Sequence, residues 1–318
     1  LAAEAVLDEA EGRQHLLLTG KGQSLRSGIG ALDPLLAGQT ELSLAVTGTD
    51  GVILLDSLDL KNPQFEAHAS GQSDNAGDRI ELTARLADLA ILVPGFPGAA
   101  HIEGQAVRDG ARWAVDATAS GPGGTDARVT GSVGTDGIAD LAIAGSAQAG
   151  LANAFIAPRS IEGPAEFDLR LAGRPSLNAL SGRLRLPGLR ISDPSLAMAV
   201  EGAEVTVDLA DGRADLSGEG SLAGGGTVSL SGPVGLTAPY TADLSVRLDA
   251  VRLRDPRLFD TRADGTLTIG GPLAGGAAIS GSVTLAETEI RVPTSGLGGY
   301  ADIGPVNHIA EPVEVRAT

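Results

Sequence analysis

The sequence predicts an all-β fold, in the form of an elongated, curled antiparallel sheet that leaves an open groove, with few short helices. The first observation is a two-residue alternation: Phe167, Leu169 and Leu171 are separated by Asp168, Arg170 and Ala172. Side chains two apart in a strand point to the same face, so each such segment has one apolar and one polar face. The second observation is glycine, at 45 of 318 residues, which favours many turns and strand bends over helices.

Composition narrows the class of protein. Hydrophobic residues make up 42% of the chain, enough for a core, but aromatic residues only 3%, few for the walls of an enzyme pocket. The net charge of −17 would repel phosphate backbones, so nucleic acid is excluded as a partner. The chain has no cysteine, no run of ~18 to 20 apolar residues that would span a membrane, and no basic-then-apolar leader. Because it starts at Leu1, we expect a piece of a longer protein.

The elements follow in order along the chain. In residues 1–11, Ala3, Val6, Leu7 and Ala10 have the spacing of a short helix, and this segment is predicted to be a short helix or a frayed start. A helical turn is expected within 29–37. Elsewhere between residues 12 and 293 the two-residue period predicts roughly two dozen short strands at the ~8–12-residue spacing of all-β proteins. Asp-Gly pairs at 50–51, 136–137 and 211–212 mark hairpins. After Pro293 the alternation fades, and 294–318 is predicted to be linker or truncated context.

Longer self-similarity divides the β body into units. The run from Ala139 to Ile143 resembles that from Ala242 to Val246, and 180–186 resembles 279–285. We therefore predict one elongated domain over 12–293, made of three degenerate units at about 12–138, 139–241 and 242–293. Such a sheet lengthens by adding units that contact mainly their neighbours.

Sites of chemistry are not evident. The four histidines have no metal-ligand spacing, and the acidic cluster at 74–78 is explained by ordinary turn chemistry better than by calcium binding. No Gly-x-Ser-x-Gly elbow, phosphate loop or acid–base pair is present, so no catalytic residue, metal ligand or cofactor is assigned and the protein is not expected to be an enzyme. Trp113, the single tryptophan, is interpreted as a packed strand residue.

The aliphatic stripe remains as the candidate site. It either packs against a second sheet, as in a sandwich, or lines a continuous groove for alkyl chains. The scarcity of large rings and the growth by repeats favour the groove. The predicted lining of this lipid groove is Leu169, Leu171, Leu184, Leu186, Val205, Val207, Val228, Leu230, Leu244, Val246, Leu267, Ile269, Val283 and Leu285.

Several sequence segments, taken in their order along the chain, make it resemble the TamB family in the form found in alphaproteobacteria. The longest segment runs from Asp255 through Gly270-Gly271-Pro272 to Pro293, and shorter segments lie at 31–38, 155–160 and 225–228. The resemblance covers about 12–300, as an internal-to-late fragment of such a protein.

The resemblance implies a periplasmic protein related to AsmA-like and bridge-type lipid-transfer proteins, with a taco-shaped β-sheet lined by aliphatic residues. It implies a helix anchored in the inner membrane, a TamA-like outer-membrane barrel as partner, and roles in outer-membrane protein assembly, secretion and phospholipid passage. We expect this chain to lack that anchor and to stop before the family's conserved carboxy-terminal domain.

Two functions stay open. In the first, phospholipid acyl chains lie along the stripe and move between the two membranes. In the second, a chaperone-like scaffold offers strand edges to incoming outer-membrane proteins and autotransporters by β-augmentation, together with the TamA-type barrel. A β-solenoid adhesin or polysaccharide enzyme would need a repeat of ~20–30 residues, which the sequence lacks.

Overall fold

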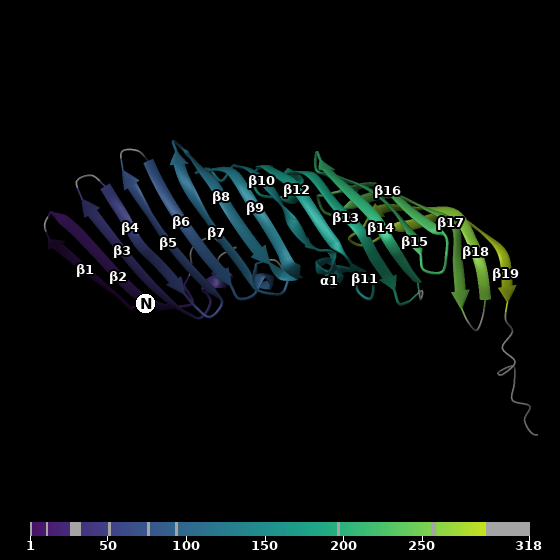
Figure 1. Cartoon of the computed structure of the whole chain (residues 1–318), viewed down its shortest axis with the longest axis horizontal. Coiled ribbons are helices and arrows are strands. Elements are labelled where there is room, and N and C mark those ends of the chain that lie inside the picture. Colours follow the sequence, from purple (N-terminus) through teal and green to yellow (C-terminus); the bar gives the residue numbers. More distant parts are fainter. Residues whose placement is uncertain are drawn as a thin grey trace, which may run out of the picture.

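The computed structural model is a single layer of antiparallel strands (Figure 1). It describes residues 2–10, 12–25, 33–49, 52–74, 77–92, 95–195, 198–255 and 259–290. The nineteen strands are β1 (Ala2–Ala10), β2 (Arg13–Gln23), β3 (Gln39–Thr49), β4 (Val52–Lys61), β5 (Phe65–Asp74), β6 (Gly77–Leu86), β7 (Ala100–Asp109), β8 (Arg112–Gly121), β9 (Thr125–Gly134), β10 (Ala139–Gln148), β11 (Ser160–Glu162), β12 (Pro164–Gly173), β13 (Leu180–Asp193), β14 (Met198–Ala210), β15 (Arg213–Leu222), β16 (Thr227–Gly235), β17 (Thr241–Asp255), β18 (Phe259–Pro272) and β19 (Ala278–Ile290).

The topology is a continuous meander. Each strand from β1 to β10 pairs with the next, β10 pairs with β12, and the series continues from β12 to β19, while the short β11 pairs with the far end of β13. Seventeen sideways steps at ~4.8 Å make a sheet roughly 80 Å long. Among the described strands β1 and β19 do not pair, so the sheet stays open and is not a barrel. This confirms the predicted fold class.

Helical structure is confined to the connections. It consists of α1 (Asn153–Ile156) and the 3₁₀ turns η1 (Asp33–Leu36), η2 (Leu89–Ile91), η3 (Pro122–Gly124), η4 (Ala149–Ala152) and η5 (Leu177–Ala179). η1 falls within the helical turn expected at 29–37, of which residues 29–32 lie outside the described part. None of the described helices is long and apolar enough to cross a membrane.

The helix predicted for residues 1–11 is wrong, because residues 2–10 form strand β1. They pair with β2 from Ala2 opposite Lys21 to Ala10 opposite Arg13. The sequence that spaces Val6, Leu7 and Ala10 as a helix also alternates Ala3, Ala5 and Leu7, and pairing with a neighbouring strand selects the second pattern.

The predicted unit boundaries leave no mark on the sheet. Residue 139 begins β10 and residue 242 lies in β17, and both strands pair with neighbours on either side as the others do. The division into three units stays a prediction. The predicted linker at 294–318 lies outside the described residues.

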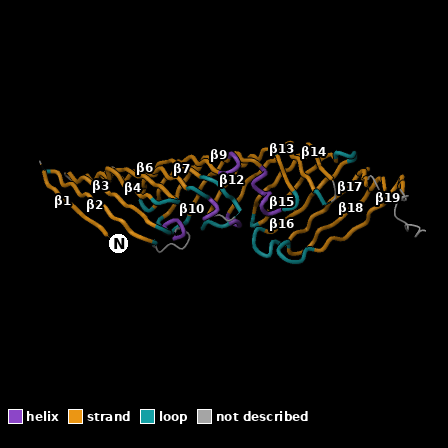
Figure 2. Tube along the Cα trace, turned by 90° about the horizontal axis from the view of Figure 1, so that it is seen from below, coloured by secondary structure: helices purple, strands orange, loops and turns teal. Residues whose placement is uncertain are grey.

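The two long rims of the sheet differ in their connections. The rim at the top of Figure 1, here called the hairpin rim, carries tight turns such as residues 110–111 between β7 and β8 and 211–212 between β14 and β15. The opposite rim, here called the loop rim, carries the long connections 24–38, 87–99 and 149–163 with most of the short helices. Figure 2 shows the layer of strands bowed, with helices and long loops gathered on one side of it.

Candidate functional site

The register of the strands joins their apolar residues into one face. Residues directly opposite each other in antiparallel strands project to the same side of the sheet. Across β14 to β18, Val205 lies opposite Gly218, which lies opposite Leu230, and that series continues through Val246 to Leu267. We call the side on which these residues lie the apolar face.

Every predicted lining residue lies on this face. Their strand positions are connected by the pairings of Phe167 with Leu184, Leu184 with Val207, and Leu244 with Ile269, and by alternation within each strand. The positions so placed are Leu169, Leu171, Leu184, Leu186, Val205, Val207, Val228, Leu230, Leu244, Val246, Leu267, Ile269, Val283 and Leu285. Their role as a lipid lining stays a prediction.

The exposure of these residues shows a face that no second layer of the described chain covers. Most of the fourteen are half-buried. Leu244 is 8% exposed, whereas Val283 and Leu285 on the outermost strand β19 are 43% and 56% exposed. Large aliphatic side chains left at such exposures in a continuous patch mark a binding surface. The sandwich interpretation therefore does not hold for the described sheet.

The apolar face also extends across the first ten strands, which the list of lining residues omitted. Its pairing continues from Leu18 to Leu44, Leu58, Ala69 and Leu82, and from there through Gly104, Ala117 and Val129 to Ile143 and Leu169. The signal that could have found these residues is the same alternation, present at residues 42–46 and 58–60. The face therefore runs from β1 to β19.

Glycines on the apolar face let neighbouring backbones approach closely. A Cβ atom on Gly182 would collide with the carbonyl oxygen of Asp168 and the Cα of Leu169 in the adjacent strand. Gly131, Gly232 and Gly281 have the same relation to their neighbours, and all four have φ between 119° and 141°. Because the neighbouring backbone occupies the space where a side chain on this face would start, the sheet bends toward its apolar face at these points.

Packing closes the apolar face along the loop rim. Leu35 of η1 is 5% exposed, and its carbonyl accepts a hydrogen bond from Asn62 Nδ2 at the start of the β4–β5 connection. Farther along, Ala149 packs with Leu189 and Ala203. A third cluster consists of Leu222, Val251 and Ala263. The face is therefore covered near the loop rim and uncovered toward the hairpin rim.

The long connection 87–99 is fixed by a carboxylate. Asp88 Oδ1 accepts hydrogen bonds from the amides of Ala90 at 3.0 Å and Gly98 at 2.9 Å. The Gly98 amide, followed by that of Ala90, lowers the pKa of the Asp88 carboxyl below its ordinary value. The loop is thus held by an acceptor that stays ionised at neutral pH.

A depressed carboxyl pKa gives a loop that weakens in acid. The contribution of Asp88 is complete above its ordinary pKa of about 3.9 and is lost as the pH falls through the lower folded value. We expect the Ala90 and Gly98 amides to lose protection from hydrogen exchange in that range, while Asp88→Asn removes the pH dependence. Unchanged protection of both amides in Asp88→Ala at pH 7 would show that the carboxylate does not hold the loop.

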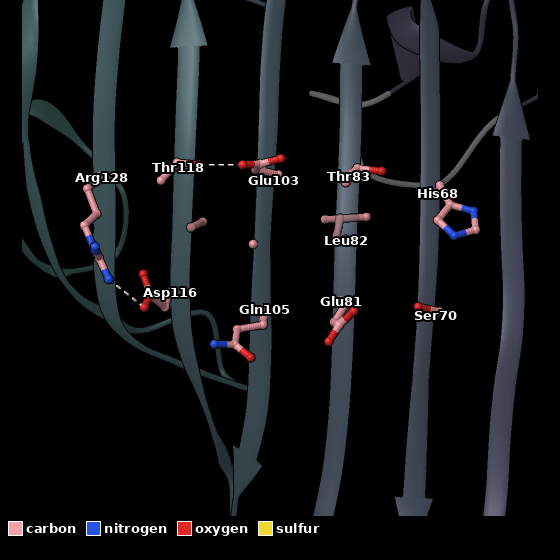
Figure 3. A pocket seen from close by; sticks show the side chains of 12 residues that line it. His68, Ser70, Glu81, Leu82, Thr83, Glu103, Gln105, Asp116, Thr118 and Arg128 are labelled. Carbon is pink, nitrogen blue, oxygen red and sulfur yellow. Dashed lines mark hydrogen bonds and ion pairs between the residues drawn. The ribbon is translucent and has the colours of Figure 1, made fainter.

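The opposite face of the sheet is polar, and ion pairs connect neighbouring strands across it. Arg128 reaches Asp116 at 2.9 Å and Thr118 donates to Glu103 at 3.4 Å, around a shallow hollow that also includes His68 (Figure 3). Elsewhere on this face the Arg170 guanidinium lowers the pKa of the Asp140 carboxyl. Exposed pairs of this kind contribute little to stability, and they keep this face hydrated.

The part of the chain that the structure describes has no group of three or more His, Asp or Glu residues arranged to hold a metal ion. His68 Nδ1 lies 2.8 Å from Asp59, and His15 Nδ1 lies 2.9 Å from Thr47 Oγ1, in pairs between neighbouring strands. These contacts are those of polar side chains on a solvated sheet.

The geometry defines a class of protein: a long, open, single-layer β-sheet with one continuous apolar face. Residues 212–312 match the family model of the TamB C-terminal domain, and this match supports a TamB-type protein. At the family level such proteins span the periplasm, associate with TamA, and act in outer-membrane assembly and lipid transport. No curated protein and no solved structure matches the chain.

The family match corrects one expectation. We expected the chain to stop before the conserved carboxy-terminal domain, but residues 212–312 match the model of the TamB C-terminal domain. Its described part begins at the β14–β15 turn and includes strands β15 to β19. Eight of the fourteen predicted lining residues, from Val228 onward, therefore lie inside the matched region, and two of them, Val283 and Leu285, are on the outermost strand.

Proposed function

We propose that the apolar face binds the acyl chains of phospholipids and conducts them along the sheet, in the periplasm, between the inner and outer membranes. The observation that supports this most is the unbroken pairing of apolar residues and glycines from β1 to β19, in a layer that the described chain covers only near the loop rim. Each CH₂ group that leaves water for this surface gains ~0.8 kcal/mol.

The uniformity of the apolar face favours movement of a bound lipid along the sheet over its retention at one position. Successive strands present the same few side chains, mainly leucine, valine, isoleucine and alanine, with glycine between them. A lipid displaced by one strand spacing meets a similar surface, so the barrier between neighbouring positions is low. The headgroup remains at the hairpin rim, because packed short helices cover parts of the apolar face at the other rim.

A second function is supported by the strand edge. All thirteen residues of β19 are exposed, and the edge that faces away from β18 has no partner strand in the described chain. An unpaired edge of this length can template an incoming strand by β-augmentation. Because β19 belongs to the conserved domain, a TamA-type barrel or an outer-membrane protein is the proposed partner there.

Photo-crosslinking separates the two functions. A crosslinking residue at Leu230, on the apolar face, is expected to capture phospholipid, whereas one at Thr284, in the edge strand, captures polypeptide if the scaffold function operates. A matched probe at Ser231, on the polar face of the same strand as Leu230, should capture neither. Lipid adducts that are as frequent at Ser231 as at Leu230 would contradict binding on the apolar face.

A further inference from the structure

Within the described strands, the apolar face carries a single cation, Arg108. Of all the lysines and arginines in the described strands, only Arg108 shares the side of the sheet defined by Leu82, Val115 and Val129. It is the penultimate residue of β7, two residues after Ala106, at the uncovered hairpin rim. A charge placed on an otherwise apolar surface is costly unless it has a use there.

Two other unusual residues meet Arg108 at this point. Trp113, the only tryptophan of the chain, is half-buried and lies directly opposite Arg108 in the pairing of β7 with β8. Asp78, at the start of β6 and on the same face, lies 3.0 Å from Arg108 Nη1 and accepts a hydrogen bond of 2.6 Å from Ser73 Oγ. The three residues come from three adjacent strands and lie at the same rim.

The contacts leave part of both charges available. Arg108 donates through Nε to the carbonyl of Gly110 at 3.1 Å and through Nη1 to Asp78, and within the described residues Nη2 has no partner. The side chain of Arg108 is 48% exposed and that of Asp78 is 24% exposed. The hydrogen bond from Ser73, and after it that from Arg108, lowers the pKa of the Asp78 carboxyl, so this carboxyl is ionised at neutral pH.

The surroundings match an amphiphile with a zwitterionic headgroup. Directly inward from the rim, Ile80, Ala106 and Val115 lie on the same face and lead into the rest of the apolar surface. A tryptophan is well suited to such a boundary between apolar surface and water, because its ring is apolar and its N–H is polar. A guanidinium binds a phosphate well, and a carboxylate beside an aromatic ring suits an ammonium group.

We propose that Asp78, Arg108 and Trp113 form a headgroup-binding station for zwitterionic phospholipids. The phosphate binds to Nη2 of Arg108, and the ammonium group lies between the Asp78 carboxylate and the Trp113 indole. This inference rests on the proposed function, in which acyl chains occupy the apolar face. Because the Asp78–Arg108 pair has no net charge, an anionic lipid without an ammonium group gains less from it than a zwitterionic lipid does.

The single tryptophan provides the readout. The full chain is titrated with dioctanoyl phosphatidylcholine, dioctanoyl phosphatidylglycerol and dioctanoylglycerol, all as monomers below micelle formation, while Trp113 fluorescence is recorded. The three lipids have identical tails and differ only in the headgroup. For the wild type we expect the phosphatidylcholine to bind most tightly and the dioctanoylglycerol most weakly.

Two variants test which residue binds the phosphate and which binds the ammonium group. Arg108→Gln should weaken phosphatidylcholine binding by about tenfold, the effect of losing one charge-assisted hydrogen bond, without changing dioctanoylglycerol binding. Asp78→Asn should remove the preference for phosphatidylcholine over phosphatidylglycerol. Arg112→Gln is the matched control, because Arg112 lies in the same hairpin on the polar face, where it donates to Ser132, and this variant should bind all three lipids as the wild type does.

The outcomes distinguish this inference from the proposed function. If the wild type binds all three lipids equally well and Arg108→Gln changes nothing, the station is wrong although the apolar face binds tails. If no lipid binds, the proposed function itself fails. If Trp113 responds only above micelle formation, the rim docks on lipid surfaces and does not hold single headgroups, which also overturns the station.

Discussion

Replacing Gly182 with alanine is expected to disrupt the pairing of β12 with β13 and to destabilise this part of the sheet by roughly 2–6 kcal/mol. Two effects add up. Gly182 has a φ of 119°, which L-residues rarely adopt, and a Cβ atom would collide with the backbone of Asp168 and Leu169 in the adjacent strand. Hydrogen-exchange mass spectrometry should show faster exchange in residues 164–173 and 180–186, because each strand of such a sheet contacts mainly its neighbours.

Gly173→Ala separates the two effects. Gly173 has a φ of 113°, close to that of Gly182, but a Cβ atom there would meet nothing within 4 Å. This variant should therefore cost only the ~1–3 kcal/mol of backbone strain. Equal effects of the two substitutions would mean that close backbone approach on the apolar face plays no part, and the bend of the sheet toward that face would need another cause.

Replacing Val246 with aspartate is expected to reduce phospholipid transfer by at least about tenfold. Val246 lies midway along the apolar face of β17, between Leu230 and Leu267 of the neighbouring strands. An acyl chain that avoids a carboxylate there loses the burial of two or more CH₂ groups, and two such groups at ~0.8 kcal/mol each already exceed a tenfold change in binding. Transfer of fluorescent phospholipid between donor and acceptor vesicles measures the effect.

Ser245→Asp is the matched control. Ser245 is the preceding residue of the same strand, is exposed, and lies on the polar face opposite Ser231 and Thr268. The same charge placed there should leave transfer unchanged. A Val246→Asp protein that keeps the wild-type circular dichroism spectrum and still transfers lipid at the wild-type rate would rule out conduction along this face.

The sequence predicted the apolar face well because alternation is local information. Once Phe167, Leu169 and Leu171 are assigned to a strand, their common side follows from strand geometry alone. The same reasoning erred at β1, where the residues around Val6 fit both periods and the neighbouring strand β2 decided between them. It also overestimated the number of strands, since several run for thirteen to fifteen residues.

Features that depend on distant contacts could not be predicted. The difference between the two rims arises because the connections 24–38, 87–99 and 149–163 all follow strands that end on the same side of the sheet, and Leu35 and Ala149 then bury against it. The association of Asp78, Arg108 and Trp113 depends on the registers of two strand pairs. In the sequence these residues are separated by up to thirty-five positions, and each looks like an ordinary turn or strand residue.

Native mass spectrometry of the purified chain tests the central claim most directly, which is that alkyl chains occupy the apolar face. After expression in the periplasm of a Gram-negative host, the wild type should retain bound phospholipid, seen as mass increments of whole lipid molecules. A Leu184→Asp/Val246→Asp double variant should lose most of it, while Ser245→Asp keeps it. A wild-type protein that carries no phospholipid, or a double variant that carries as much as the wild type, would contradict the account.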